Sequence, residues 1–414
     1  MKILISHPTG NQNSRNAARA FAERAMLQEF VTTLNFDLES AYWKRVPPAI
    51  QNVFRKRDYS DIGGPIHNAA THLEAGRLLS LRLGLKRFFP SAQKIFNIDR
   101  VYDAIDDATA KRVSKIANLT SVYAYEGAAR RTFEQAGRKG LFRVYELPIG
   151  YWRRRNRLSS EQEQLRPEWA HTWQSHNEST SKFEDRDAEL ANADCIVVPS
   201  CFVADTLSDY PGRLAPIVVV PYGCPEPIAA EIRTWRTDGK LRVLFVGGIS
   251  ERKGLSYLLE AIKGLSDRIE MTFIGAGPGE ALLHEQGYSS RTASHPEVLR
   301  AMREHDVLAF PSLFEGYGLV VAEALSQGLP VIATPNSGAT GIIQNGVNGW
   351  IVPIRDAAAI RAQLDKLLAD RSLSKRMGLA ALQGAAGWTW RHYRSQLSAE
   401  VLSAMSETTN RLAS

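Results

Sequence analysis

Two glutamates eight positions apart, Glu315 and Glu323, stand in the stretch that most constrains the fold of this chain. The apolar run 306–310 before them is typical of a short buried strand, and a proline ends it. Residues 319–327 keep helical spacing, Gly328 suits the left-handed position after a helix, and a proline two residues later prevents continuation. The stretch therefore predicts a strand, a loop and a helix of an open parallel sheet, in which ligands bind outside the carboxyl ends of the strands.

The predicted loop and helix start offer groups that suit a phosphorylated ligand. The N–H groups of Gly318 and Leu319 begin the helix unpaired, at the positive end of its dipole, which favours phosphate. Gly316 and Gly318 let a ligand approach the backbone closely. Glu323 can accept hydrogen bonds from both hydroxyls of a ribose, and Glu315 faces whatever lies beyond the phosphates. A sugar, phosphates and a ribose in a row make a nucleotide sugar. A plain surface loop accounts less well for the two glutamates together with strand, glycines and helix.

A basic turn earlier in the chain fits the same ligand. Residues 241–248 predict a strand that runs into a glycine turn, and Arg252 and Lys253 come just before a helix over residues 255–265. The helix dipole prefers anions at that end, so the two cations do not serve the helix. They are explained if a diphosphate lies between them and the helix. Taken alone, two exposed basic residues in a turn would be the simpler explanation, but the glutamate stretch favours the diphosphate.

From about Leu241 to Pro353 the chain resembles, motif by motif, the family-4 group (group 1) of retaining glycosyltransferases, which have the GT-B fold. Before that stretch the resemblance is mainly one of architecture. Relatives typically have an arginine directly after the first glycine of the basic turn, where this chain has Gly248. They also have a lysine before the later glycine. Lys253 therefore matches the family pattern, whereas Arg252 is a substitute for the missing arginine.

Two positions in the first half also bear on this resemblance. In the family, a glycine in the first loop lies beside the donor phosphates, and Gly10 is the matching position. Many relatives place a histidine near the end of the strand that we expect at residues 121–125, where it contacts the donor sugar. This chain has Tyr125 and Glu126 there instead, so we assign no catalytic histidine.

The resemblance implies that a sugar moves from a nucleotide donor to an acceptor hydroxyl with retention of the anomeric configuration. Arg252 and Lys253 would stabilise charge on the departing diphosphate, and Glu315 would contact the sugar and favour an oxocarbenium-like transition state. Glu323 would bind the ribose. No cofactor and no metal ion are expected. The candidate catalytic residues are Glu315, Lys253 and Arg252, and the candidate donor-binding residues are Gly10, Gly248, Arg252, Lys253, Gly316, Tyr317, Gly318, Leu319 and Glu323.

Strand and helix patterns alternate along the whole chain. This predicts an α/β fold of two doubly wound Rossmann-like domains that face each other across a cleft. We expect an N-terminal acceptor-binding domain over residues 1–225 and a nucleotide-sugar-binding domain over residues 226–385. A final helix within residues 386–414 is expected to cross back to the first domain.

Within the first half, the pattern predicts several further elements. A helix follows the first loop, runs to about Phe30 and is capped by Asn13 or Ser14. A strand is expected at residues 94–98. A charged helix is expected from about Ser160 to Asn192, and Asp185 and Asp187 on it are more typical of solvated surface than of a metal site.

The net charge of +7 lies almost entirely in the first half, with 31 Lys and Arg against 25 Asp and Glu in residues 1–223. Basic clusters at residues 55–57, 82–89 and 153–157 can face anionic lipid head groups or a pyrophosphate-linked acceptor, or they form a solvated basic face. No nucleic-acid module accompanies them, so nucleic acid is not an expected partner. No apolar run is long enough to span a membrane, and the chain enters a strand directly. We expect a cytoplasmic protein, with peripheral contact at the inner membrane face as an option.

These observations predict a glycosyltransferase of polysaccharide or glycolipid biosynthesis, acting on a saccharide or lipid-linked acceptor. A UDP-sugar is the favoured donor and GDP-mannose the next. Two alternatives stay open. A nucleotide-sugar epimerase shares the two-domain fold, and a non-catalytic partner subunit would use the cleft only to bind a nucleotide. The intact pair Glu315 and Glu323 argues against the second alternative.

Overall fold

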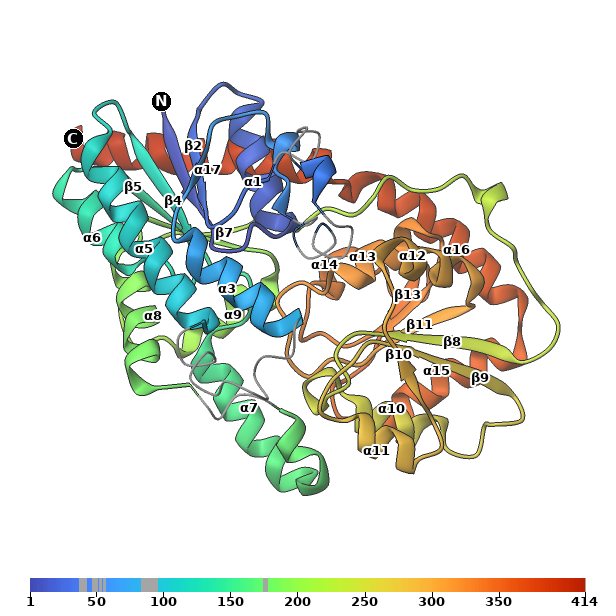
Figure 1. The fold of residues 1–414 in the computed structure, drawn as a ribbon. Coiled ribbons are helices and arrows are strands. Elements are labelled where there is room, and N and C mark those ends of the chain that lie inside the picture. The colour runs from blue at the N-terminus through green and yellow to red at the C-terminus, as the bar shows by residue number, and fades with distance from the viewer. Residues whose placement is uncertain are drawn as a thin grey trace.

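The chain folds around two parallel β-sheets, seen in a computed structural model that describes residues 1–36, 43–46, 51, 54, 57–82, 96–173 and 178–413. Within these residues the first sheet has the strand order β3-β2-β1-β4-β5-β6-β7 and the second the order β10-β9-β8-β11-β12-β13 (Figure 1). The first sheet consists of β1 (Ile3–Ser6), β2 (Leu27–Thr32), β3 (Ile66–Asn68), β4 (Ser121–Tyr125), β5 (Phe142–Glu146), β6 (Cys195–Val198) and β7 (Ile217–Val219). The second consists of β8 (Leu241–Val246), β9 (Ile269–Ile274), β10 (Ser290–Arg291), β11 (Val307–Phe310), β12 (Val331–Ala333) and β13 (Gly349–Ile351).

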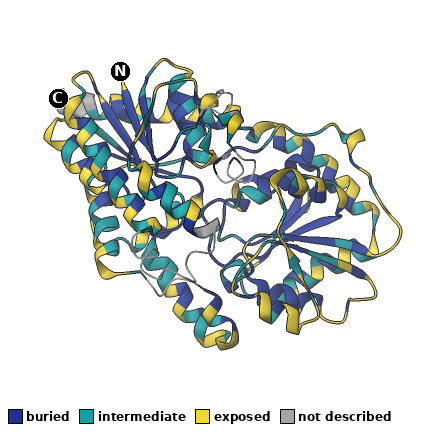
Figure 2. Ribbon diagram, in the orientation of Figure 1, coloured by how far each residue is buried: buried dark blue, intermediate teal, exposed yellow. Residues whose placement is uncertain are grey.

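Helices cover both faces of each sheet (Figure 2). Because both faces are buried, the strands consist mainly of consecutive apolar residues. The helices of the first part are α1 (Gln12–Ala22), α3 (Thr71–Arg82), α5 (Ile98–Lys115), α6 (Arg130–Arg138), α7 (Trp152–Leu165), α8 (Thr180–Asn192) and α9 (Cys201–Thr206). Those of the second part are α10 (Leu255–Ile262), α11 (Glu280–Glu285), α12 (His295–Glu304), α13 (Leu319–Ser326), α14 (Ala339–Ile342), α15 (Ala357–Ala369), α16 (Ser372–Ala385) and α17 (Trp390–Ala413). The predicted class, two doubly wound α/β domains, is confirmed.

Each sheet reverses its strand order once near its middle. The reversal lies between β1 and β4 in the first sheet and between β8 and β11 in the second. At such a switch point the connections leave the sheet on opposite sides, which opens a crevice at the carboxyl ends of the strands. The loop after β1 and the loops after β8 and β11 therefore stand where a ligand would bind.

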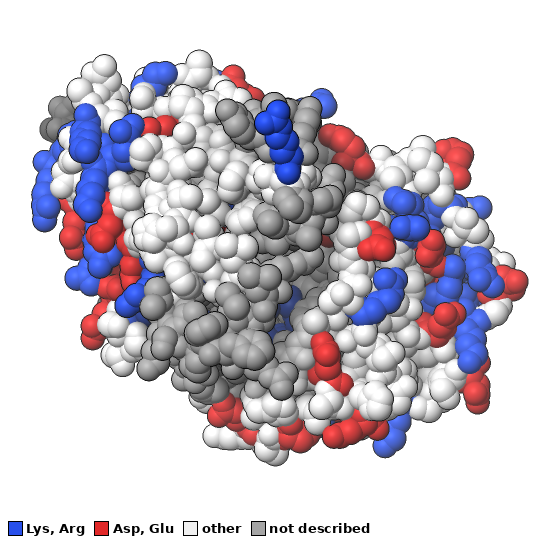
Figure 3. Space-filling view, viewed as in Figure 1, with Lys and Arg blue, Asp and Glu red and all other residues white. Residues whose placement is uncertain are grey.

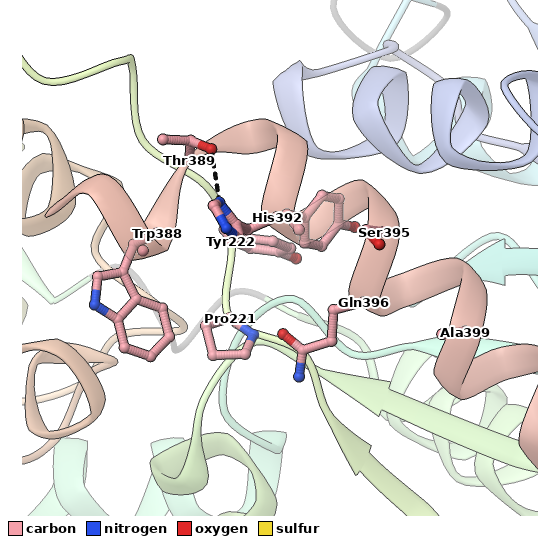
Figure 4. Close-up of a pocket in the computed structure, with 10 residues that line it drawn as sticks. Pro221, Tyr222, Trp388, Thr389, His392, Ser395, Gln396 and Ala399 are labelled. Carbon is pink, nitrogen blue, oxygen red and sulfur yellow. Dashed lines mark hydrogen bonds between the residues drawn. The ribbon is translucent and has the colours of Figure 1, made fainter.

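The chain passes between the two sheets twice, and the two passages lie side by side. The Cys224 N–H donates to the Trp388 carbonyl at 2.8 Å, and the Trp390 N–H donates to the Cys224 carbonyl at 3.3 Å. Gly223 permits this approach, because a Cβ there would lie 2.4 Å from Trp390 Cα. Figure 4 shows the junction, with Tyr222 beside the start of α17. Here a cavity of about 280 Å³ is lined by Pro221, Tyr222, Gly387, Trp388, Thr389, His392, Tyr393, Ser395, Gln396 and Ala399.

The last helix, α17, packs along α1 of the first sheet (Figure 1). Its side chains Tyr393, Leu397 and Val401 are buried in the same apolar cluster as residues of α1. Arg394 pairs with Glu23 at 2.7 Å. The chain's last helix thus completes the core around its first strand.

The predicted single helix over residues 160–192 is wrong. The segment contains the end of α7, a short 3₁₀ helix at Pro167–Thr172, and α8. Pro167 lacks the N–H that would continue α7. This break lets α7 reach the second sheet's elements, where Gln162 Nε2 donates to Glu251 Oε1 at 2.6 Å. Asp187 lies on α8, as predicted, and accepts from Trp152 Nε1 at 2.8 Å, so it joins α8 to α7.

The first helix is shorter than predicted. It ends at Ala22, and the predicted continuation to Phe30 is wrong because residues 27–32 form β2. The β-branched Val31 and Thr32 favour a strand there. The cap is Asn11, whose Oδ1 accepts from the Ser14 N–H at 2.9 Å, in place of Asn13 or Ser14.

Two other predictions, a strand at residues 94–98 and two basic clusters, fall partly outside the described residues. Positions 94 and 95 of the expected strand lie outside them. At positions 97 and 98 the prediction of a strand is wrong, because Asn97 caps α5, which begins at Ile98. The basic clusters 55–57 and 82–89 lie outside the described residues except for Arg57 and the backbone of Arg82.

Arg233 holds together the ends of two helices. Its Nη1 donates to the carbonyls of Met302 at 2.6 Å and Gln327 at 3.1 Å, and Nη2 donates to the His305 carbonyl. We expect Arg233→Ala to lower the free energy of unfolding by about 2 kcal/mol, because buried helix-end carbonyls lose their donor. Urea unfolding of Arg236→Ala, which removes an exposed arginine three residues on, serves as the control and should match wild type within about 0.5 kcal/mol. Equal stability of the two variants would contradict this.

Candidate functional site

A groove of about 290 Å³ opens where the two sheets' loops meet. The loops after β8 and β11, on either side of the second sheet's switch point, both reach it, and the start of α13 lies between them. The first sheet supplies the opposite wall. The groove is lined by Asn13, Pro148 and Tyr222 from the first part of the chain and by Val246, Gly247, Lys253, Phe310, Glu315, Tyr317, Gly318, Leu319 and Val320 from the second.

Lys253 and Glu315 form an ion pair at this groove. Lys253 Nζ contacts Glu315 Oε2, and Arg252 Nη1 lies 3.3 Å from the same oxygen. Arg252 Nη1 also donates to the Phe314 carbonyl at 2.8 Å. Burial, and then the charge of Arg252, lower the pKa of Lys253 well below its usual value. Lys253 and Arg252 thus converge on one carboxylate, and an anionic ligand in the groove would favour the charged form of Lys253.

The basic turn and the glutamate loop are locked together through their backbones. The Leu313 N–H donates to the Arg252 carbonyl at 2.9 Å. Gly254 has a φ of +68° and lies against this loop so closely that a Cβ would come within 1.9 Å of the Pro311 carbonyl oxygen. Only glycine combines this backbone conformation with this contact. The position of Lys253 is therefore set by its neighbour Gly254 as well as by Glu315.

A buried carboxylate supports the basic turn from behind. Glu251 is fully buried, and its Oε1 accepts from Ser256 Oγ at 2.6 Å as well as from Gln162 of α7. Burial raises the pKa of Glu251 to about 7. The Glu251 N–H donates to Thr172 Oγ1 at 2.8 Å. Residues from before the predicted boundary at 225 therefore help to position the cations that follow Glu251.

Two glycines in the loop that carries Glu315, Gly316 and Gly318, are needed for different structural reasons. Gly318 has a φ of +79° and precedes the first residue of α13. Gly316 lies against the first part of the chain, because a Cβ there would lie 1.9 Å from the Pro148 carbonyl oxygen. The Gly316 carbonyl accepts from Ser200 Oγ at 2.7 Å. The loop that carries Glu315 is thus fixed by both sheets.

Glu323 lies in α13, almost fully buried, and its carboxylate has a partner. Glu323 Oε1 lies 2.9 Å from Nε2 of His295, the first residue of α12. His295 is half exposed. A ribose at this position would therefore share Glu323 with His295.

Gly10 has a structural reason to be glycine. Its φ is +53°, and a Cβ would lie within 2.4 Å of the Tyr59 ring. Its N–H donates to Nδ1 of His7 at 2.9 Å. His7 is buried, and burial followed by the charge of Arg57 lowers the pKa of His7 to about 3, so it is a neutral acceptor. The Gly10 N–H is therefore already bonded within the loop. Gly10 could help a ligand only by lacking a side chain, which lets the ligand come close to the backbone.

Not every predicted residue lines the groove. Lys253, Glu315, Tyr317, Gly318 and Leu319 do. Arg252 and Gly316 lie directly beside these residues and contact the loops that form it. Glu323 does not line the groove, and its carboxylate contacts His295, which lines a neighbouring cavity. Gly248 is exposed on the turn after β8, where a Cβ would make ordinary contacts with the Ala276 carbonyl oxygen at 3.9 Å and Ser250 Oγ at 4.0 Å, and Gly10 lines a neighbouring cavity.

Sequence reasoning did not single out two residues that line the groove, Asn13 and Tyr222, or His295 of the neighbouring cavity. Asn13 was predicted only as a helix cap, and no role was predicted for Tyr222 or His295. His295 could have been found, since Ser294 and Glu297 form a capping box that starts α12 at this point. Tyr222 had no such signal, because its contact with the Tyr317 ring, at 5.5 Å between centroids, joins residues far apart in the chain.

No group of three or more His, Cys, Asp or Glu side chains that could hold a metal ion occurs among the described residues. Within the same residues, no helix combines the length and apolarity needed to cross a membrane. On the face shown in Figure 3, Lys and Arg gather over the end of the first domain that carries α5 and α6, with Asp and Glu among them.

Comparison with known protein families gives a match in the second half of the chain. Residues 240–370 match the family described as Glycosyl transferases group 1. The second domain belongs to the group 1 glycosyl transferases. The matched residues of this group 1 domain include Lys253, Glu315 and Glu323, so they contain the whole of the motif on which the predicted resemblance was based.

Curated relatives of the group 1 domain are glycosyltransferases. The chain is 31% identical over 182 residues to a D-inositol 3-phosphate glycosyltransferase of Xylanimonas cellulosilytica, a match that covers 41% of this chain and 43% of that protein. It is 28% identical over 223 residues to the phosphatidyl-myo-inositol mannosyltransferase of Mycobacterium leprae, covering 50% and 54%. The chain thus spans about half the length of the curated relatives it matches.

Solved structures extend the likeness to both domains. The sucrose-phosphate synthase of Thermosynechococcus elongatus superposes with a TM-score of 0.65 at 18% identity, over 98% of this chain and all of that one. The Anabaena protein HepE in complex with UDP superposes with a TM-score of 0.60 at 15% identity, again over 98% and 100%. At these identities the likeness concerns the fold, and the chain has the GT-B fold.

Proposed function

We propose that this protein is a retaining glycosyltransferase, a hexosyltransferase that moves a sugar from a nucleotide donor to an acceptor hydroxyl. One observation carries the proposal: Lys253, Glu315 and the start of α13 meet in one groove between the domains. The groove combines positive charge, a helix start that favours phosphate, and a carboxylate. This is the set of groups that a nucleotide diphosphate with an attached sugar requires.

Each group has a role in the proposed reaction. The diphosphate lies between Lys253, Arg252 and the N–H groups at the start of α13, which stabilise the charge that develops as the sugar leaves. Glu315 lies next to Lys253 and faces the sugar, where its negative charge favours an oxocarbenium-like transition state. Glu323 binds the ribose hydroxyls. No metal ion and no cofactor take part in this scheme.

A UDP-sugar is the donor that we favour, with GDP-mannose next. The acceptor is a saccharide or a lipid-linked saccharide, bound mainly by the domain over residues 1–225, and the donor is bound by the domain over residues 226–385. The product would enter polysaccharide or glycolipid synthesis. We place the reaction in the cytoplasm, with peripheral contact of the basic first domain at the inner membrane face.

A donor panel tests the reaction class. Purified protein is incubated with UDP- and GDP-sugars, with and without candidate acceptors, and the released nucleotide and the sugar products are measured. Acceptor-dependent release of nucleotide and a product that keeps the donor's anomeric configuration by NMR are the expected results. Release of free sugar or an epimer without acceptor would show an epimerase, whereas nucleotide-dependent thermal stabilisation without any turnover would show a binding subunit.

A second test addresses the ribose contact of Glu323. We expect Glu323→Gln to weaken binding of the preferred nucleoside diphosphate about tenfold or more, since a charged acceptor is lost from a ribose hydroxyl. Binding of the 2′-deoxy nucleotide should change less. The matched variant His295→Ala removes the protein partner of Glu323 and should leave the preference for ribose intact. If Glu323→Gln keeps that preference, the carboxylate serves only to hold His295.

A further inference from the structure

A second and larger cavity, of about 860 Å³, lies beside the donor groove. The first loop and α1 form one wall, and the start of α17 forms another. Two features mark its boundary with the groove: Asn11 and Gln12 line the cavity while Asn13 lines the groove, and His295 on the cavity wall contacts Glu323. The described lining residues are Thr9, Gly10, Asn11, Gln12, Arg15, Asn16, Arg19, Arg57, Asp61, Arg77, His295, Trp390 and Arg394.

The wall of this cavity is strongly basic. Five of its described lining residues are arginines, and one, Asp61, is an acid. Two further carboxylates, Glu74 and Glu23, contact these arginines. Five arginines against three carboxylates leave an excess of two positive charges among the described residues, which is about the charge of one phosphate monoester at neutral pH.

The guanidinium groups are held in place and still reach the surface of the cavity. Glu74, with no exposed side-chain surface, pairs with Arg57 at 2.6 Å and with Arg77 at 2.7 Å. Arg394 donates to Asn16 Oδ1 at 3.0 Å in addition to its pair with Glu23. The side chains of the five lining arginines, Arg15, Arg19, Arg57, Arg77 and Arg394, are between 12% and 34% exposed. Prepositioned guanidinium forks of this kind suit phosphate oxygens.

The position of the cavity adds to this chemistry. The helix α1 begins at Gln12, so its first turn, which favours anions, stands at the cavity wall. Most residues that line the cavity come from the first domain, to which the proposed function assigns the acceptor. Its volume suits a ligand of the size of a sugar phosphate or a lipid head group.

We propose that this arginine cavity binds a phosphate group of the acceptor, so that the acceptor is a phosphorylated saccharide, a phosphorylated cyclitol or a phospholipid head group. The proposal rests on the proposed function, because it takes the neighbouring groove to be the donor site. The phosphate, held by the arginines, would fix the acceptor while the hydroxyl at its other end points to the groove. The cavity would then select acceptors by charge before it selects them by shape.

Binding measurements at a saturating concentration of UDP test the proposal, because the nucleotide then occupies the groove. The probes are matched pairs: glucose and glucose 6-phosphate, inositol and inositol 1-phosphate, and phosphatidylcholine vesicles with and without phosphatidylinositol. We expect a phosphorylated probe to bind wild type at least tenfold more tightly than its neutral partner. A soluble phosphate ester and a vesicle that differ in affinity show which source of phosphate the cavity accepts.

Three variants locate the binding. Arg77→Gln and Arg19→Gln each remove one cation from the cavity and should weaken binding of the phosphorylated probe about tenfold. Arg19 is the safer change for the fold, since its nearest described carboxylate lies 3.6 Å away and it is one-third exposed. Arg138→Gln, on the exposed surface of α6, is the matched control and should bind as wild type does.

The outcomes separate this proposal from the proposed function. Nucleotide affinity should be the same in all three variants, since none of them changes the groove. If wild type binds UDP but binds each phosphorylated probe no better than its neutral partner, or if the two cavity variants bind like the control, the arginine cavity is only a network of salt bridges. Failure of wild type to bind UDP or any other nucleotide would instead overturn the donor groove itself.

Discussion

Lys253→Met is expected to lower the rate of sugar transfer about a hundredfold to a thousandfold, which is the usual cost of losing one group that stabilises transition-state charge. The methionine keeps the length of the buried stem but cannot carry charge. Lys253 is also the partner of Glu315, so the loss should exceed what weaker nucleotide binding alone would cause. Turnover at saturating donor and the dissociation constant of the nucleotide, measured on the same preparation, separate the two effects.

Lys375→Met is the matched control for this prediction. Lys375 lies exposed on α16 of the same domain, away from the groove, and its replacement should leave turnover unchanged. The melting temperature of Lys253→Met shows whether the variant is folded. A folded Lys253→Met enzyme with turnover within twofold of wild type would mean that the lysine only neutralises Glu315, and the assigned role in catalysis would be wrong.

Gly254→Ala should remove activity by a different route. A methyl group there would lie 1.9 Å from the Pro311 carbonyl oxygen, and the residue has a φ of +68°. Strain at positive φ costs an alanine about 1 to 2 kcal/mol, and the clash must push the basic turn away from the glutamate loop. We expect a loss of about 4 kcal/mol in the free energy of unfolding or, if the turn yields, a folded protein with at least tenfold lower turnover.

Gly264→Ala separates the clash from the backbone strain. Gly264 has a φ of +75°, close to that of Gly254, but a Cβ there would meet no atom within 4 Å. It should therefore show only the strain, about 1 to 2 kcal/mol, with normal turnover. Urea unfolding and transfer rates of both variants test this. Similar results for Gly254→Ala and Gly264→Ala would show that the contact with Pro311 is not what holds the turn in place.

The second domain could be predicted closely from the sequence because its signals are local. The apolar run before Glu315 is β11, the helical spacing after Gly318 is α13, and Gly328 has the left-handed backbone expected after that helix. Strand, glycine and helix follow one another there without interruption. The order of these elements, together with parallel pairing, was enough to place the glutamates at the carboxyl edge of a sheet.

The first domain was harder to predict because its structure depends on distant contacts. The strand β2 carries a polar residue, Glu29, whose partner Arg112 on α5 lies 83 positions later, at 2.7 Å. Pro167 marks the break between α7 and α8 in the sequence, but nothing local indicates the contact of Gln162 with Glu251, 89 positions later, that follows from it. Neither contact leaves a trace in local periodicity.

The same reason explains what was missed at the groove and beside it. Arg19, Arg77 and Arg394 come from three separate helices, and no motif joins them. The sequence showed an excess of basic residues in the first half but could not say which of them face inwards. Only the meeting of α1, α3 and α17 gathers them around one cavity.

The packing of α17 against α1 bears on how the chain is synthesised. The first strand and first helix are made before the second domain, whereas α17, the helix that covers them, is made after it. The strands of the second domain are complete at Ile351, before α17 is made. Domains usually fold in the order in which they are translated, from the N-terminus. Here α1 stays uncovered until the second domain has been made and α17 can pack against it.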